Sequence, residues 1–292
     1  MGEAKLNAPA GWQHKMWNLS FNRWRGLMLC FVCSSAYAEI GTLVMKPTTD
    51  MERAEVSYLK PIGSPKAALV LCPGCNGDGL GMIQQREWQD FANREHLGLM
   101  GIHFQSPIDL LSMCQGYYQA SKGSGEILLK SIRSIYGRDL PILIYGFSGG
   151  AHFTTRFIAW KPERILGWCA LGAGVLDQPV PSSSNPPGIM ACGEDDSRLG
   201  GALVFFKQGR AAQKPWLWIE VPKTGHATSP NLDNFVRSYF TSLLHHASVT
   251  GTWVDIDLMK EISREEAQQT PSLSGWLPDR DLFKSWEQFR EN

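Results

Sequence analysis

Short apolar runs and amphipathic stretches alternate along this chain from about residue 56 to residue 244. The apolar runs are typical of strands buried on both faces of a parallel sheet, and the amphipathic stretches are typical of helices packed on it. The runs predict strands near 56–59, 67–71, 97–104, 140–145, 165–171, 189–192 and 216–221, and the stretches predict helices near 84–95, 127–136, 151–160, 199–213 and 232–244. This alternation predicts an α/β domain with right-handed crossovers, to which residues 39–60 add a first, antiparallel part of the sheet.

The last part of the chain, residues 248–292, is more polar than the rest. Its apolar residues form one cluster, made up of Trp276, Leu277, Leu282, Phe283 and Trp286. We expect this segment to be a C-terminal extension packed on the domain, so that residues 39–292 form a single domain.

The N-terminal segment has the pattern of a secretory signal. Arg23 and Arg25 precede the apolar run 26–33, and Ala36-Tyr37-Ala38 follows it. A basic region, an apolar region and an A-x-A motif in this order predict a signal peptide over residues 1–38, cleaved after Ala38. The apolar run 26–33 is shorter than a typical transmembrane helix. Residues 1–15 add nothing to such a signal, so Met16 is an alternative start. We expect a periplasmic or secreted protein without a stable membrane anchor; an uncleaved N-terminal anchor is the alternative.

Charge and motifs restrict the partners and cofactors. The chain has 28 Lys and Arg against 28 Asp and Glu and no long basic run, so nucleic acid is a poor candidate partner. It contains no H-E-x-x-H motif, no carboxylate-rich calcium loop and no glycine-rich nucleotide-binding motif between a strand and a helix. We therefore expect neither a metal nor another cofactor.

Signal cleavage would leave five cysteines, namely Cys72, Cys75, Cys114, Cys169 and Cys192. An odd number cannot all pair within one chain, and the pairing cannot be deduced from spacing. Cys72-Pro73-Gly74-Cys75 has C-x-x-C spacing, which leaves a redox function as a remote alternative. Cys169 and Cys192 fall inside predicted strands and are expected to be buried as small hydrophobic residues.

The strongest chemical signal is Gly146-Phe147-Ser148-Gly149-Gly150, which joins a predicted strand to a predicted helix. This is the G-x-S-x-G nucleophile elbow, in which small residues let the serine occupy a tight, strained turn above the sheet. The helix N-terminus that follows favours a developing negative charge. The motif predicts Ser148 as a nucleophile.

A serine hydroxyl needs a base to become reactive, and the base needs an acid to orient it. The carboxyl ends of parallel strands meet at one edge of a sheet, so the loops after later strands can supply both groups. Asp195 and Asp196 follow the strand 189–192, and His226 follows the strand 216–221.

The order of Ser148, Gly193-Glu194-Asp195-Asp196 and Gly225-His226 resembles that of the α/β-hydrolase superfamily. The chain is most similar to compact bacterial esterases and dienelactone-hydrolase-like proteins, over about residues 56–244. The resemblance implies an α/β-hydrolase fold, with a mostly parallel central sheet, helices on both faces and no substantial lid domain.

The resemblance also implies the role of each residue. Ser148 would be the nucleophile, His226 the base and Asp196 the acid, because the family commonly places the acid three residues after the glycine that ends the strand. Asp195 and Asp177 are the alternative acids.

The oxyanion hole should combine the N–H of Gly149 with an N–H from the loop after the strand 67–71. Cys75 is the first choice for that donor and Asn76 the second. Pro73-Gly74 stands where the family usually has His-Gly. Asn76, Tyr117 and Tyr118 are candidate substrate-binding residues, and the loop 177–187 is a candidate wall of the site.

These residues predict a secreted serine hydrolase that cleaves small or polymeric carboxylic esters through an acyl-enzyme on Ser148, at a shallow, exposed site. A peptidase or amidase with the same triad is the alternative enzyme. A non-catalytic binding protein on the same scaffold is the alternative of another class.

Overall fold

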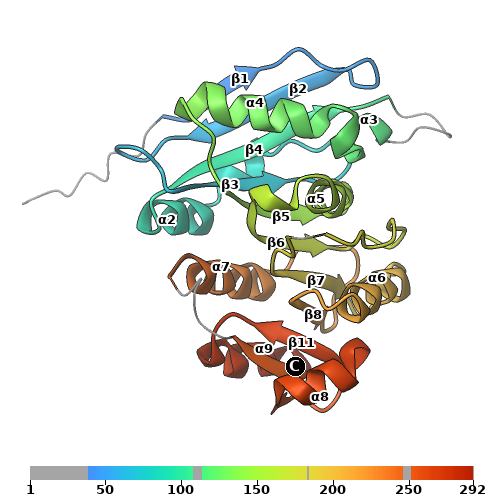
Figure 1. Cartoon of the computed structure of the whole chain (residues 1–292). Helices are drawn as coiled ribbons and strands as arrows, with labels where there is room; N and C mark the ends of the chain where they lie inside the picture. Colours follow the sequence, from blue (N-terminus) through green and yellow to red (C-terminus); the bar gives the residue numbers. More distant parts are fainter. Residues whose placement is uncertain (1–38, 108–113, 183, 246–250, 292) are drawn as a thin grey trace, which may run out of the picture. The chain divides into compact units, whose positions relative to one another are not determined.

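The computed structural model describes residues 39–107, 114–182, 184–245 and 251–291; the expected signal peptide lies outside them. Its main feature is an eight-stranded sheet with the strand order β1-β2-β4-β3-β5-β6-β7-β8 (Figure 1). The strands are β1 (Gly41–Val44), β2 (Arg53–Leu59), β3 (Ala67–Cys72), β4 (Leu97–Gln105), β5 (Ile142–Phe147), β6 (Ile165–Leu171), β7 (Gly188–Gly193) and β8 (Trp216–Val221). β2 pairs antiparallel with β1 and β4, and all later pairings are parallel. Every strand predicted in residues 39–221 is present.

Helices cover both faces of this sheet (Figure 1). The core on one face includes residues of α4 (Ser124–Tyr136), α5 (Gly149–Trp160) and α6 (Leu199–Ala211). The core on the other face includes residues of α2 (Arg86–Arg94) and α7 (Pro230–His245). The residues of β3 alternate between these two cores, and all six are buried. This is expected for a central parallel strand that has helices packed on both of its faces.

Several connections between the strands and the longer helices contain short helical turns. They contain the one-turn helices α1 (Leu80–Ile83) and α3 (Gln115–Tyr118) and the 3-10 turns η1 (Ala120–Lys122) and η2 (Pro162–Arg164). The connection from β6 to β7, residues 172–187, contains no helix in its described part. Parallel strands are usually joined through a helix, so this crossover is unusual and leaves space between α5 and α6.

The C-terminal extension contains a small antiparallel sheet, in the order β10-β9-β11. Its elements are β9 (Thr252–Asp255), β10 (Lys260–Ile262), α8 (Arg264–Gln269), η3 (Pro271–Leu273), β11 (Ser274–Leu277), η4 (Arg280–Leu282) and α9 (Phe283–Glu291). Trp286 Nε1 donates a hydrogen bond to the carbonyl of Trp218 in β8, and Arg210 Nε of α6 donates one to the carbonyl of Ser274. These strands could not be predicted from the sequence, because three or four residues are too few to show a period.

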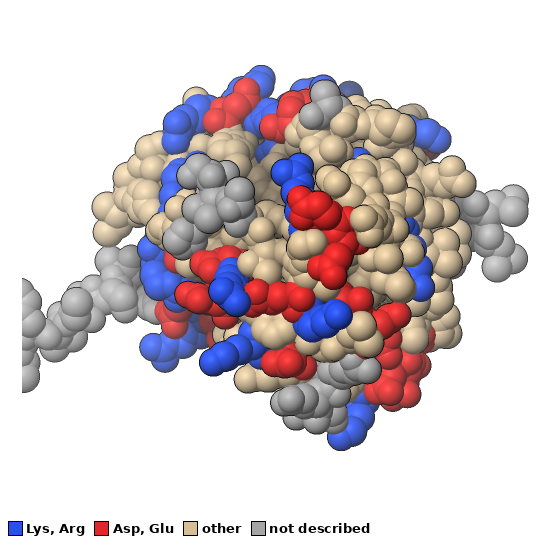
Figure 2. Space-filling model, turned by 60° about the horizontal axis from the view of Figure 1, so that its bottom comes forward, with Lys and Arg blue, Asp and Glu red and all other residues tan. Residues whose placement is uncertain are grey.

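Two further observations concern the exterior. Figure 2 shows acidic and basic side chains interspersed with each other and with uncharged residues on the face it displays, in keeping with the zero net charge. Among the residues that the structure describes, no helix has the length and hydropathy needed to cross a membrane.

Candidate active site

Ser148 occupies a strained turn between β5 and α5. Its φ of 54° and ψ of −112° lie outside the regions that L-residues usually adopt. The flanking glycines make the turn feasible, since a Cβ on Gly146 would collide with the carbonyl of Gly150, and a Cβ on Gly150 with that of Cys72. The Ser148 N–H donates to the carbonyl of Leu171 in β6 at 2.8 Å, which anchors the turn to the neighbouring strand.

His226 joins Ser148 to a carboxylate. It lies in the loop between β8 and α7, with its Nε2 2.9 Å from Ser148 Oγ and its Nδ1 2.7 Å from Asp196 Oδ2. The ring of Phe147 packs beside the imidazole, with 4.9 Å between the ring centroids. The structure thus brings together three residues that lie far apart in the chain.

Asp196 is buried, with 5% of its surface exposed, in the turn after β7. Its Oδ1 accepts hydrogen bonds from the backbone N–H and from Nη1 of Arg198, each at 3.0 Å. Burial acts to raise the pKa of this carboxyl, but the hydrogen bonds from His226 and Arg198 outweigh it and hold the pKa below its ordinary value. Asp196 is therefore ionised at neutral pH and able to orient His226.

Neither of the two alternative acids contacts His226. Asp195 is exposed, and its backbone N–H donates to the carbonyl of Thr224 at 3.0 Å. Asp177 accepts two hydrogen bonds from Arg156, from Nε at 2.8 Å and from Nη2 at 3.3 Å. Since both ring nitrogens of His226 are occupied by Ser148 and Asp196, neither alternative is the carboxylate that contacts it.

The two expected oxyanion donors, the N–H groups of Gly149 and Cys75, lie close to each other beside Ser148. A Cβ built on Gly149 would lie 2.5 Å from the backbone nitrogen of Cys75, so the two backbones are in close contact. A Cβ on Gly74 would lie 4.0 Å from Ser148 Oγ. In the described part of the chain, none of the backbone hydrogen bonds is donated by the N–H of Cys75 or Gly149. Both donors can therefore serve an oxygen bound near Ser148.

Long-range contacts hold the loop that carries Cys75. The Asn76 side chain donates from Nδ2 to the carbonyl of Ser106 at 2.8 Å, and its Oδ1 accepts the N–H of Ser106 at 2.9 Å. A disulfide joins Cys75 to Cys114 with 5.9 Å between the Cα atoms, and the Tyr117 hydroxyl donates to the carbonyl of Pro73 at 2.9 Å. The loop is thus tied to the end of β4 and to α3.

These contacts correct two expectations and exclude the remote redox alternative. Tyr117 is only 1% exposed, so it packs beneath the loop and does not line the site. The Asn76 amide is used in positioning the loop and is not free for a substrate. Cys72 is buried and free, and Cys75 is paired with Cys114, so the C-x-x-C segment does not form a redox pair. Cysteine spacing could not have found this pairing.

Tyr118 of α3 and His152 of α5 lie together near Gly149. Their rings stack with 4.9 Å between centroids, and a Cβ on Gly149 would lie 2.9 Å from the Tyr118 ring. Tyr118 is partly exposed, as a residue lining a site should be. Burial, together with the charge of Arg156, lowers the pKa of His152 to about 4, so this histidine is neutral at pH 7.

No group of three or more His, Cys, Asp and Glu side chains in the described ranges is arranged to hold a metal ion. The groups that the structure brings together at Ser148 are the serine hydroxyl, the His226 imidazole, the Asp196 carboxylate and the backbone N–H groups of Gly149 and Cys75.

Comparisons with known proteins give structural matches only. No family model matches the chain, and no curated protein matches it. It is similar to a solved poly(3-hydroxybutyrate) depolymerase from Bordetella parapertussis (14% identity, 80% of this chain and 94% of the other, TM-score 0.51). It is also similar to a fluorophosphonate-binding serine hydrolase from Staphylococcus aureus (13%, 72% and 99%, 0.51) and to a ferulic acid esterase (14%, 71% and 97%, 0.52).

Proposed function

Given that the chain has the α/β-hydrolase fold, we propose that it is a serine hydrolase that cleaves carboxylic esters through an acyl-enzyme on Ser148. The observation that carries the proposal is the continuous hydrogen-bonded series from Ser148 Oγ through His226 to Asp196. The backbone N–H groups of Gly149 and Cys75 lie beside Ser148, where they can donate hydrogen bonds to the oxyanion of the tetrahedral intermediate.

In acylation, Ser148 Oγ attacks the ester carbonyl carbon while His226 Nε2 accepts the hydroxyl proton. The resulting imidazolium is stabilised by Asp196, to which its Nδ1–H donates. The carbonyl oxygen becomes an oxyanion that accepts hydrogen bonds from Gly149 and Cys75, and each such donor in a comparable site contributes about 10²–10³-fold to kcat. His226 then returns its proton to the departing alcohol.

Deacylation repeats these steps with water as the nucleophile. His226 takes a proton from the water as its oxygen attacks the acyl carbon, and the bond to Ser148 Oγ breaks with return of that proton to the serine. The products are a carboxylic acid and the free enzyme. His226 is 30% exposed at its side chain, so water and a bulky substrate can both reach the centre.

Ester substrates are supported by the structural matches, two of whose names are those of ester-cleaving enzymes. Secretion is part of the same proposal. It is supported by the order of Arg23, Arg25, the apolar run and Ala36-Tyr37-Ala38, and by the Cys75–Cys114 disulfide, because disulfides persist mainly in oxidising compartments.

A fluorophosphonate probe and two substrates test the activity. We expect the mature chain from Glu39 to be labelled, to hydrolyse an aliphatic nitrophenyl ester, and to lose both properties in Ser148→Ala. Faster turnover of a peptide anilide than of the ester would favour the peptidase. Absence of labelling in folded protein would favour a non-catalytic binding protein.

A further inference from the structure

The turn from β7 into α6 brings a cationic side chain to the carboxylate that orients His226. Arg198 is the residue before α6, and its Nη1 donates a hydrogen bond to Asp196 Oδ1 at 3.0 Å. The backbone N–H of Arg198 donates to the same oxygen, also at 3.0 Å. Asp196 Oδ2 lies 2.7 Å from His226 Nδ1. Arg198 and His226 therefore hold the two different oxygens of one carboxylate.

The two contacts of Arg198 place different demands on the sequence. Any residue except proline at this position supplies the backbone N–H, whereas the other hydrogen bond needs a long side chain with a charged donor. Such charge-assisted hydrogen bonds are about twice as strong as neutral ones. The Asp196 side chain is 1% exposed and the Arg198 side chain 41% exposed, so the guanidinium reaches a carboxylate that is shielded from water. The guanidinium thus restricts the rotation of the carboxylate.

The stem of the Arg198 side chain is confined by the loop that follows β6. A Cβ built on Gly174 would lie 2.9 Å from Arg198 Cβ and 3.1 Å from its Cγ, so a side chain at this position would displace the arginine. The loop itself lies against α6, because a Cβ on Gly201 would collide with the carbonyl oxygen of Gly174. Arg198 is therefore held by packing along its stem as well as by hydrogen bonds at its end.

The same loop also contacts the imidazole and the carboxylate. Gly172 has a φ of 72°, and a Cβ on it would lie 3.2 Å from His226 Nδ1 and 3.4 Å from Asp196 Oδ2. Residues 172–174 thus lie along both the imidazole–carboxylate pair and the stem of Arg198. This packing leaves little room for the carboxylate to turn while Arg198 keeps its position.

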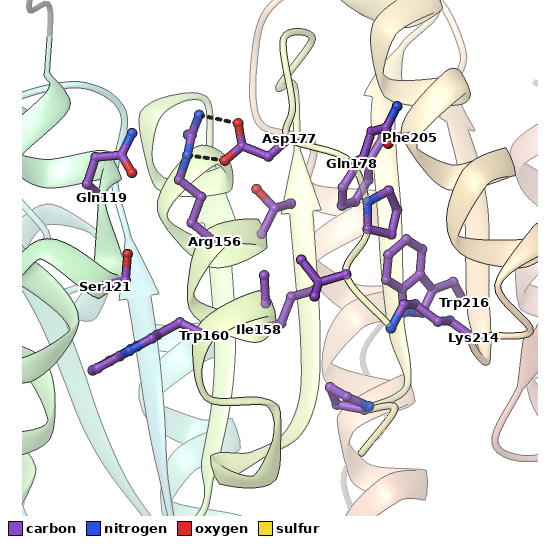
Figure 3. A pocket seen from close by; sticks show the side chains of 15 residues that line it. Gln119, Ser121, Arg156, Ile158, Trp160, Asp177, Gln178, Phe205, Lys214 and Trp216 are labelled. Atoms are coloured by element: carbon purple, nitrogen blue, oxygen red, sulfur yellow. Dashed lines mark hydrogen bonds and ion pairs between the residues drawn. The ribbon is translucent and has the colours of Figure 1, made fainter. Parts of the chain in front are cut away.

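A second arginine–aspartate pair provides a comparison. Arg156 of α5 donates to Asp177 from Nε and Nη2, and the two residues line a cavity of about 300 Å³ between α5 and the β6–β7 crossover (Figure 3). Besides the burial of His152, the charges of Arg156 and Arg198 both lower the pKa of this histidine, so both guanidinium groups act near the site. In the described part of the chain, only Arg198 of these two donates to Asp196.

We propose that Arg198 is a positioning residue, which holds the Asp196 carboxylate in the orientation that keeps His226 aligned with Ser148. The inference rests on the proposed ester hydrolase and adds one side chain to the groups on which its rate depends. Because Arg198 acts through Asp196 and not on the bound substrate, its loss should appear in kcat and not in KM.

Steady-state kinetics on a nitrophenyl ester tests this role. Arg198→Met removes the charge and the donors but keeps a stem that can pack against Gly174. We expect kcat to fall by about tenfold, which is less than the roughly 10²-fold that a 1 Å misplacement can cost. KM should change by less than about twofold. Arg156→Met is the matched control and should leave kcat within about twofold, as a substitution away from the carboxylate.

Gly174→Ala provides a second variant, which keeps the test decisive if Arg198→Met folds poorly. The added methyl group should displace the Arg198 stem and lower kcat without removing the guanidinium. Gly200→Ala is its matched control and should leave kcat unchanged, because a Cβ on Gly200 would have no atom of the described chain within 4 Å.

A double-mutant cycle and proton NMR show whether Arg198 acts through Asp196. In the Asp196→Asn background, Arg198→Met should slow fluorophosphonate labelling by less than about twofold, because the carboxylate on which it acts is absent. The His226 Nδ1–H that bonds to Asp196 should give a resolved downfield resonance in the wild type. This resonance should shift or broaden in Arg198→Met and stay unchanged in Arg156→Met.

The outcomes separate this inference from the proposed function. Unchanged kcat in Arg198→Met, a loss confined to KM, or a full loss in the Asp196→Asn background overturns the positioning role and leaves the esterase intact. Equal losses in Arg156→Met also overturn it. Absence of fluorophosphonate labelling and of ester hydrolysis in the folded wild type instead refutes the hydrolase. The NMR resonance then still shows whether Arg198 orients the pair of Asp196 and His226.

Discussion

The two sides of the candidate site are built in different ways. On the nucleophile side, Ser148, Gly149 and their glycine neighbours are contiguous, and the tight turn between β5 and α5 places them. On the side of the Cys75 loop, the position depends on partners that are 30 to 44 residues away in the chain, namely Ser106, Cys114 and Tyr117. The first side can be built by local backbone geometry, whereas the second requires the rest of the fold.

The largest effect should come from the carboxylate that orients His226. Asp196→Asn should reduce kcat by about 10⁴-fold, because the amide no longer holds the imidazole in the required tautomer. Asp195→Asn is the matched control and should leave kcat within about twofold, since this exposed side chain is not the partner of His226. Steady-state kinetics on a nitrophenyl ester measures both. Equal losses in the two variants would contradict the assignment.

The next effect should come from the disulfide that ties the Cys75 loop to α3. Cys114→Ser breaks the disulfide and leaves the Cys75 loop less firmly held. We expect kcat to fall by about tenfold or more with little change in KM, because the Cys75 N–H stabilises the oxyanion of the transition state and not the bound substrate.

Cys169→Ser provides a control for a buried cysteine outside the loop. Mild reduction of the wild-type protein should reproduce the Cys114→Ser effect, and reoxidation should reverse it. Unchanged kcat in reduced, folded protein would show that the loop keeps its position without the crosslink.

The hydrogen bonds of Asp196 should appear in the pH dependence of stability. His226 and Arg198 hold the pKa of Asp196 in the folded state below the ordinary Asp pKa of about 4. The ionised carboxylate therefore makes its full contribution to the free energy of unfolding at pH values above about 4. That contribution is lost as the pH falls through the lower folded-state value. Urea unfolding of the wild type and Asp196→Asn at pH 6 and below pH 4 should therefore show a free-energy difference that shrinks in acid. A difference that stays constant would contradict the lowered pKa.

The smallest effect should come from Tyr117→Phe, which removes a neutral hydrogen bond to the carbonyl of Pro73 and keeps the buried ring. We expect a loss of about 1 kcal/mol in the free energy of unfolding. Because the disulfide and Asn76 still hold the loop, kcat should change by less than about threefold. Tyr58→Phe, at a tyrosine of β2 away from the loop, is the control. A kcat loss as large as that of Cys114→Ser would mean that Tyr117 also positions the oxyanion donors.

Much of the fold could be predicted from the pattern of the sequence. The alternation of buried strands and amphipathic helices predicted a parallel α/β sheet, because each period reflects which faces are buried. The α/β-hydrolase fold was implied by the resemblance of the segments around Ser148, Asp196 and His226 to that superfamily, and it is confirmed. The strands β9 to β11 were not predicted, because three or four residues are too few to show an alternation of apolar and polar positions. Asn76 and Tyr117 were assigned to the substrate because polar and aromatic residues in loops suit that role, whereas both hold the loop.

By itself, the sequence determined the elements whose signal is local: the buried strands, the amphipathic helices and the glycine-lined turn at Ser148. The tertiary structure alone decided which of Asp177, Asp195 and Asp196 meets His226, that Cys75 pairs with Cys114, and that a crossover without a helix leaves a cavity beside α5. The physical reason is that these features depend on distances between residues far apart in the chain. Such distances are set by the packing of the whole core, which no local pattern records.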